Sequence, residues 1–132
     1  MHDYLLGLYE KSMPNELTWA ERLQAAKDAG FDYVEMSVDE SDARLARLDM
    51  SEGELDTIRA AMRATGVPIG SICLSGHRKY PFGDPDPEKQ ARSLEIMEKA
   101  VRLAAALGIR TIQLAGSDVY YSEGTAETRQ AF

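Results

Sequence analysis

The strongest constraint on the fold of this chain is a unit that occurs three times: an Ala-rich helical segment, a glycine and a short apolar run. The glycines are Gly30, Gly66 and Gly108, separated by 36 and 42 residues. A glycine directly after a helix takes the left-handed backbone conformation that other residues avoid. The spacing suits one strand and one helix in each unit, so the sequence predicts repeated β-α units.

Each helix of these units begins with a capping signal. Two are capping boxes, a hydroxyl residue with a glutamate three positions later: Thr18 with Glu21, and Ser51 with Glu54. In the third, Asp86 caps a helix that starts at Pro87. Apolar residues then recur at helical spacing, and we expect these stripes to pack against a sheet: Trp19, Leu23 and Ala26; Leu55, Ile58 and Met62; Leu94, Met97, Val101 and Ala104.

Four apolar runs alternate with these helices and predict strands over residues 5–10, 32–38, 68–75 and 110–116. Strands separated by helices form parallel sheets with right-handed crossovers, so the fold class is α/β. The length of 132 residues is about half that of an ordinary eight-stranded β/α barrel. A last helical pattern stops at Phe132 with no strand after it, so we expect residues 1–132 to be one partial domain with an incomplete fourth helix.

Composition excludes several classes of protein. The net charge of −7 argues against binding to a nucleic-acid backbone, which relies on Lys and Arg. No apolar run is long enough to cross a membrane, and the N-terminus lacks the pattern of a secretory signal. The single cysteine, Cys73, excludes an internal disulfide, and we expect it to be a small core residue. We therefore expect a cytoplasmic protein without nucleic-acid or membrane partners.

Polar residues lie on one face of the predicted strands. Side chains alternate along a strand, so Glu35 and Ser37 share a face in the second strand, and Gln113 lies on such a face in the fourth. A parallel strand covered on both sides is usually apolar on both, so these residues indicate a polar barrel interior or cleft. Glu35 is a candidate acid/base or substrate contact, or a structural carboxylate paired with a Lys or Arg from a neighbouring strand.

The loop after the third predicted strand carries the other candidates. His77, Arg78 and Lys79 lie at the carboxyl end of the sheet, where α/β proteins bind ligands. They suit an anion or a sugar phosphate, although an exposed loop histidine is often without function. Tyr120 and Tyr121, after the fourth strand, could stack on a sugar or cover the barrel mouth. No phosphate-binding glycine motif and no zinc motif occurs in the sequence.

Five segments in order carry a resemblance to a known family: residues 7–11 (GLYEK), 31–40 (FDYVEMSVDE), 73–78 (CLSGHR), 94–97 (LEIM) and 112–121 (IQLAGSDVYY). With them the chain resembles the N-terminal half of bacterial L-ribulose-5-phosphate (L-xylulose-5-phosphate) 3-epimerases, also named hexulose-6-phosphate isomerases. These belong to the xylose-isomerase-like TIM-barrel superfamily. The resemblance implies half of a TIM (β/α)₈ barrel.

The resemblance also implies an isomerase of carbohydrate metabolism that epimerises a ketopentose 5-phosphate at C3. In the family, one glutamate removes the proton beside the carbonyl, a second returns a proton to the opposite face, and a divalent metal stabilises the enediolate. The family carries these glutamates and metal ligands on later strands. We therefore assign no catalytic residue and no metal ligand to this chain and expect it alone to be inactive. The first-half positions are expected to contact substrate: Glu35, Ser37, His77, Arg78 and Gln113.

Two alternatives remain open from the residues. The chain could be a non-catalytic half-barrel that is stabilised by self-association, because four strands leave two open sheet edges. Two copies would then supply eight strands, and a homo-oligomer is expected. Alternatively, the chain could be a small flavodoxin-like domain that binds a phosphorylated ligand.

Overall fold

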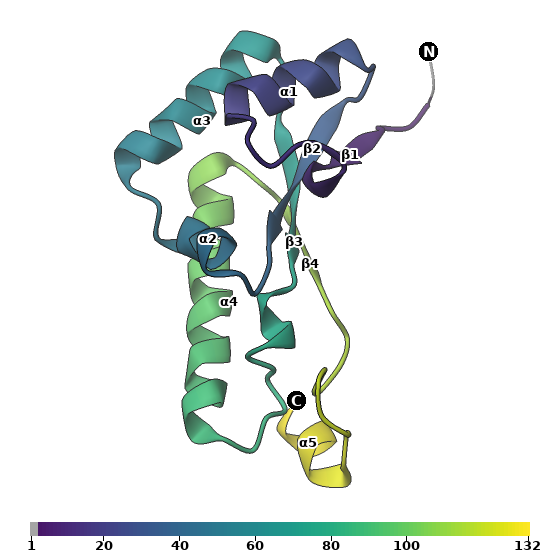
Figure 1. Cartoon of the computed structure of the whole chain (residues 1–132), viewed down its shortest axis with the longest axis vertical. Helices are drawn as coiled ribbons and strands as arrows, with labels where there is room; N and C mark the ends of the chain where they lie inside the picture. The colour runs from purple at the N-terminus through teal and green to yellow at the C-terminus, as the bar shows by residue number, and fades with distance from the viewer. Residues whose placement is uncertain (1–2) are drawn as a thin grey trace.

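The computed structural model describes residues 3–132, and its four strands form one parallel sheet with the consecutive order β1-β2-β3-β4 (Figure 1). The strands are β1 (Gly7–Tyr9), β2 (Tyr33–Val38), β3 (Ile69–Leu74) and β4 (Thr111–Leu114). Each lies inside a predicted run and is shorter than that run. The four predicted strands and their parallel arrangement are therefore confirmed.

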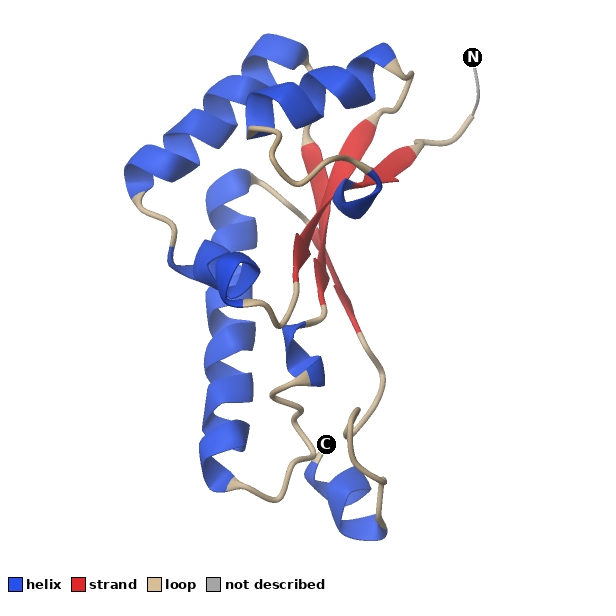
Figure 2. Cartoon of the chain, viewed as in Figure 1, coloured by secondary structure: helices blue, strands red, loops and turns tan. Residues whose placement is uncertain are grey.

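Three long helices connect the strands: α1 (Trp19–Asp28), α3 (Glu52–Thr65) and α4 (Pro87–Leu107). Two short helices, α2 (Asp42–Leu45) and α5 (Ala126–Ala131), follow β2 and β4. Single 3₁₀ turns occupy η1 (Glu10–Ser12), η2 (Ala46–Asp49) and η3 (Gly76–Arg78). The long helices all lie on one side of the sheet, and its other face is not covered by helices (Figure 2).

This arrangement decides between the predicted α/β architectures. A flavodoxin-like domain has the strand order 2-1-3-4-5 and helices on both faces of its sheet. The consecutive strand order and the single helical layer contradict that alternative. They are the arrangement of half a β/α barrel, in which each strand pairs with the next and the helices form the outer ring.

The predicted helix ends are confirmed. Both capping boxes form, and Asp86 accepts a hydrogen bond from the backbone of Glu88 ahead of α4. Gly30, Gly66 and Gly108 have φ of 84°, 73° and 71°. The repeated unit of the sequence therefore corresponds to three helices, each followed within two residues by a glycine in the left-handed conformation.

The core lies between the sheet and the helices. Val34, Met36 and Ile72 of the strands are fully buried against the helical layer. The predicted stripe on α4 is partly wrong, because Leu94 and Val101 are 55% and 50% exposed. The buried face of α4 is a neighbouring one, formed by Ser93, Ile96, Ala100, Leu103, Ala104 and Leu107. Both faces of α4 carry apolar residues at helical spacing, so the periodicity alone does not identify the buried one.

Among residues 3–132, no helix combines the length and the apolar character that crossing a membrane requires.

Candidate functional site

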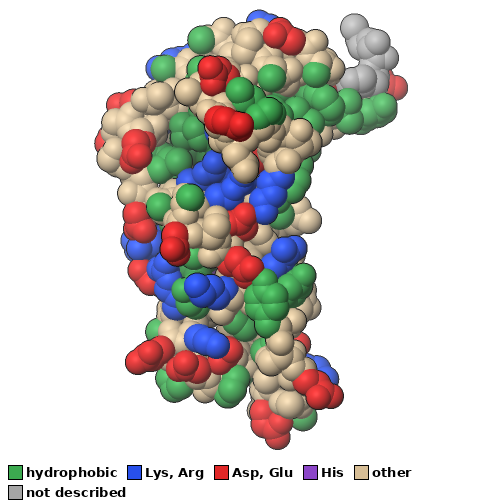
Figure 3. Space-filling view, in the orientation of Figure 1, with side chains coloured by type: hydrophobic (Ala, Val, Ile, Leu, Met, Phe, Trp, Pro, Cys, Tyr) green, Lys and Arg blue, Asp and Glu red, His purple; other side chains and the backbone are tan. Residues whose placement is uncertain are grey.

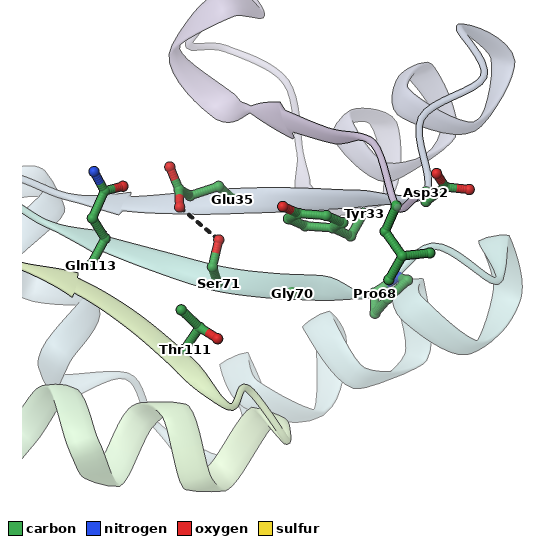
Figure 4. Close-up of a pocket in the computed structure, with 9 residues that line it drawn as sticks. Asp32, Tyr33, Glu35, Pro68, Gly70, Ser71, Thr111 and Gln113 are labelled. Carbon is green, nitrogen blue, oxygen red and sulfur yellow. Dashed lines mark hydrogen bonds between the residues drawn. The ribbon is translucent and has the colours of Figure 1, made fainter. Parts of the chain in front are cut away.

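The uncovered face of the sheet carries polar side chains around a cavity of about 670 Å³ (Figure 4). Glu35, Ser71 and Gln113, from three neighbouring strands, are among the residues that line it. Ser71 Oγ donates a hydrogen bond to Glu35 Oε2 at 2.6 Å, and the two residues are register partners across β2 and β3. The partner of Glu35 is therefore a serine, and the alternative of a Lys or Arg partner is wrong. Gln113 is exposed, as expected for a side chain on an open face.

Tyr33 lies across the amino-terminal part of the same face. A Cβ atom added to Gly70 would lie 2.6 Å from Tyr33 Cδ2, and one added to Gly7 would lie 2.3 Å from Tyr33 Cζ. Both distances are shorter than real carbon contacts, so the ring occupies space that these glycines leave empty. The flat ring above Gly70 is visible in Figure 4. Glycines in β1 and β3 thus allow an aromatic residue of β2 to lie against the sheet.

Ser37 lies nearer the carboxyl end of β2 and is completely buried. Its hydroxyl accepts a hydrogen bond from Tyr9 Oη at 3.3 Å, and its backbone N donates to Glu10 Oε2 at 2.5 Å. Cys73, the register partner of Ser37 on β3, is half-buried and is not part of the buried core, so the prediction that it is a small core residue is wrong. Ser37 therefore takes part in hydrogen bonds inside the protein, near the carboxyl end of the sheet.

Glu10 is the most buried charged residue described, with 1% of its surface exposed, and the sequence did not single it out. Arg47 donates to both of its carboxylate oxygens, at 2.6 and 3.0 Å. Arg44 Nη1 and Arg22 Nε lie 3.2 and 3.8 Å from Oε1. The Arg22 and Arg47 guanidinium groups also lie 5.1 and 5.2 Å from the centre of a Trp19 ring. The ion pairs of Glu10 therefore link η1 to α1, α2 and η2.

Basic side chains also gather on the surface beneath α1 and beside α2 (Figure 3). Lys11 Nζ lies 2.7 Å from Asp39 Oδ2, so the lysine after β1 is paired with the carboxylate after β2. Burial of Asp39 opposes its ionisation, but hydrogen bonds from Lys11 and Ser41 outweigh burial and lower the pKa of Asp39 to about 2. The contact joins the two loops at the carboxyl end of the sheet.

His77 is in η3, as the sequence suggests, but it is not an exposed loop residue. It is only 8% exposed, its Nε2 lies 2.9 Å from the carbonyl oxygen of Ser93, and its ring packs on Phe82 at 4.4 Å between centroids. Burial lowers the pKa of His77, against the opposing effect of the Ser93 carbonyl. Phe82 and the turn of α4 around Ser93 cover the ring, and neither contact could be inferred from the position of His77 in a loop.

Arg78 and the two tyrosines come together at the carboxyl end of the sheet. The Arg78 guanidinium lies 4.9 Å from the centre of the Tyr120 ring, and Arg78 is exposed. Tyr121 Oη donates a hydrogen bond to Glu40, which follows β2, and this contact raises the pKa of Tyr121. The tyrosine pair therefore bridges the loops after β2, β3 and β4, as expected of residues that cover a barrel mouth.

The family resemblance implies a divalent metal, which needs several carboxylate or imidazole ligands close together. Within residues 3–132, no group of three or more His, Cys, Asp or Glu side chains is placed to hold a metal ion. The carboxylate of Glu10 already pairs with arginines. The ring of His77 already contacts the Ser93 carbonyl and packs on Phe82. The described residues therefore do not fit a metal centre, and no catalytic step through a metal is assigned to this chain.

A consecutive parallel sheet with one helical layer and a polar inner face defines the chain as part of a β/α barrel. A sequence model described as xylose isomerase-like TIM barrel matches residues 23–132. The chain belongs to this family.

Two similar proteins are sugar-phosphate epimerases by name. "Putative L-ribulose-5-phosphate 3-epimerase SgbU" of Escherichia coli K12 is 56% identical over 132 residues, which cover 100% of this chain and 46% of that protein. "L-ribulose-5-phosphate 3-epimerase UlaE" of Salmonella paratyphi B is 54% identical over 127 residues, which cover 96% of this chain and 45% of that protein. The chain spans slightly less than half the length of these relatives.

Two solved structures share the fold. D-psicose 3-epimerase, crystallised in the presence of D-fructose, superposes with a TM-score of 0.68 at 19% identity and covers 83% of this chain and 36% of its own. The apo form of 3-keto-D-glucoside 4-epimerase YcjR from E. coli gives a TM-score of 0.62 at 22% identity, covering 81% of this chain and 36% of its own. In both, the match is to part of a larger chain.

Proposed function

We propose that this chain forms the first four β-α units of a cytoplasmic sugar-phosphate 3-epimerase that acts on a ketopentose 5-phosphate. The observation that carries the proposal is the 56% identity to the SgbU protein over all 132 residues. On this proposal residues 1–132 are a partial domain, and the catalytic carboxylates and metal ligands belong to a second half.

The role of the chain is then to build one side of the substrate site. Glu35 and Gln113 lie on the open inner face, and Arg78 lies at the mouth. On this proposal these three residues contact the substrate. Ser37 and His77 are buried, so their contribution is to hold β2 and η3 in position.

The proposal is tested by replacing the matching segment of the Salmonella UlaE protein with residues 1–132. The chimera should convert L-ribulose 5-phosphate to its C3 epimer, whereas the 132-residue chain alone should not. UlaE itself and a chimera carrying the corresponding half of an unrelated β/α barrel are the controls. A folded chimera that binds metal but leaves the substrate unchanged would contradict the proposal.

Self-association is a second candidate property, favoured by the two open edges of the sheet. β1 and β4 are each paired on one side only, and the inner face has no helical cover. A twofold axis through the barrel centre would place β4 of one copy beside β1 of the other in parallel orientation. Light scattering should then show a dimer or larger assembly, and a monomer at every concentration would contradict it.

A further inference from the structure

Glu35 carries a negative charge on the inner face of the sheet, the face that no helix covers (Figures 2 and 4). One of its carboxylate oxygens, Oε2, accepts the hydrogen bond from Ser71 Oγ at 2.6 Å. Within residues 3–132, Ser71 is the only hydrogen-bond partner of this carboxylate. The second oxygen points away from Ser71 (Figure 4). Glu35 therefore presents a carboxylate oxygen without a protein partner on the open face.

The cavity around Glu35 has no positively charged lining residue. None of the residues that line it is a lysine, an arginine or a histidine. A second acid, Asp32, lies at its amino-terminal end and accepts a hydrogen bond from the backbone N of Leu6. The side chains of Thr111 and Gln113, which line the cavity from β4, are neutral. As far as the structure describes the chain, the lining of this cavity is negative and holds no cation that could balance Glu35.

Closure of a β/α barrel over this face would bury Glu35. The interior of such a barrel is filled by layers of four side chains that come from alternate strands. Glu35 on β2 would therefore share its layer with a residue of β4 and with residues of the sixth and eighth strands. An ionised carboxylate that loses its water destabilises a protein strongly unless a cation and hydrogen bonds compensate for the loss. One hydrogen bond from a serine does not compensate, so closure requires a positive charge beside Glu35.

A second copy of the chain does not supply this charge. In a barrel closed by two copies, the sixth and eighth strands would be β2 and β4 of the second copy. The layer would then hold a second Glu35 beside neutral residues of β4, and two carboxylates would share one interior without a cation. The SgbU and UlaE proteins are about twice as long as this chain, which covers 46% and 45% of them. A second half with a sequence of its own can carry the missing charge.

We propose that the second half of the barrel places a Lys or Arg side chain of its sixth or eighth strand against Glu35. The inference rests on the proposed function, which makes this chain the first half of a longer protein. A carboxylate has about four acceptor positions, so a bond from Ser71 and a pair with a cation leave room for the substrate contact assigned to Glu35. Glu35 thereby favours closure by a complementary half over closure by a second copy.

The metal-loaded UlaE chimera and the 132-residue chain test the pair together. Glu35→Gln should raise the unfolding equilibrium constant of the chimera about a hundredfold or more in urea denaturation, because it leaves a buried cation unpaired. In the chain alone the same change should raise that constant less than about tenfold, since only the bond from Ser71 is altered. Glu98→Gln, at an exposed position of α4, should have little effect in either protein. An equal effect of Glu35→Gln in both would overturn the proposal.

Double-mutant cycles in the chimera identify the cation. Each Lys and Arg of the UlaE half is replaced by Met, once with Glu35 present and once with Glu35→Gln. Loss of the paired cation should lower the unfolding constant of the Glu35→Gln chimera about tenfold or more, and it should restore folding if that variant alone does not fold. If no replacement rescues the Glu35→Gln chimera, the proposal is wrong.

Light scattering and amide hydrogen exchange of the 132-residue chain examine closure by a second copy. A dimer with protected amides along β1 and β4 that is as stable with Glu35 as with Glu35→Gln would show that closure needs no cation. The pair and the proposed function fail separately. An inactive chimera with a clear rescue would refute the epimerase assignment alone, and an active chimera without a rescue would refute the Glu35 pair alone.

Discussion

Arg47 holds Glu10 by two hydrogen bonds, from Nη1 to Oε2 at 2.6 Å and from Nη2 to Oε1 at 3.0 Å. The pair joins η1, directly after β1, to η2, which lies beyond the end of β2. A planar guanidinium matches a carboxylate in this two-point manner, which fixes orientation as well as distance. The pair therefore stabilises the carboxyl end of the sheet, where the candidate ligand-binding residues lie, on the side that the helices cover.

Glu10→Gln tests how much this ion pair stabilises the protein. The substitution leaves the side chain nearly the same size but removes the buried carboxylate that faces Arg22, Arg44 and Arg47, so most of this buried positive charge loses its compensation. We expect the free energy of unfolding to fall by about 3–5 kcal/mol, measured by urea denaturation. Glu98→Gln, which changes an exposed glutamate on α4, should cost less than about 0.5 kcal/mol. A similar, small effect in both variants would show that the cluster does not stabilise the fold.

The contact between Tyr33 and Gly70 predicts a steric effect. Gly70→Ala places a methyl group 2.6 Å from Tyr33 Cδ2 and 2.8 Å from Cγ, so the ring or the strand must shift. We expect a loss of about 1–3 kcal/mol of stability. Gly116→Ala is the matched control, since a Cβ there meets no atom within 4 Å. Combining Gly70→Ala with Tyr33→Ala should cost less than the sum of the two changes, and additive costs would contradict the contact.

Gly53 in α3 and Gly66, which caps the end of that helix, should respond in opposite directions to the same substitution. Gly66 ends the helix with φ of 73°, so Gly66→Ala should destabilise the protein by about 1–2 kcal/mol. Gly53 lies in the first turn, where an added Cβ meets only Ser51 Oγ at 3.9 Å. Gly53→Ala should therefore stabilise it by about 0.5 kcal/mol. Thermal denaturation of both variants checks the prediction, and a shift of the same sign in both would contradict it.

Asp39 predicts a pH dependence of stability at low pH. Its pKa in the folded protein is lowered to about 2, from an ordinary value of 3.8. The ionised group therefore adds stability above about pH 4, and this contribution is lost as the pH falls through about 2. Asp39→Asn should reduce the change in unfolding free energy between these pH values, measured by urea denaturation. Asp28→Asn removes an exposed carboxylate as a control, and equal pH curves for the two variants would contradict the prediction.

The sequence predicts the elements of this fold well where the signal is local. Capping boxes, left-handed glycines and the four strands are each encoded within a few neighbouring residues, and the structure confirms them. The buried face of α4 was mistaken because Leu94 and Val101 continue an apolar stripe that no described element covers. A helix with two apolar faces needs its neighbours to be known before its orientation can be predicted.

The candidate site was less predictable, because its contacts join residues far apart in the sequence. Glu10 meets Arg22, Arg44 and Arg47 only after α1 and α2 have packed on the sheet, and no spacing rule links these positions. His77 is buried because Phe82 and the turn of α4 around Ser93 fold over it. The serine partner of Glu35 depends on the register of β2 against β3. Arg78 remains at the mouth as predicted, and Tyr120 holds it there.

NMR of L-ribulose 5-phosphate incubated with the UlaE chimera in deuterated water tests whether this chain is the first half of an epimerase acting at C3 of a ketose phosphate. We expect deuterium to enter at C3 and the C3 epimer to accumulate. A folded, metal-loaded chimera that leaves the C3 hydrogen in place, or that exchanges hydrogen only at C1 as a ketose–aldose isomerase would, contradicts this assignment.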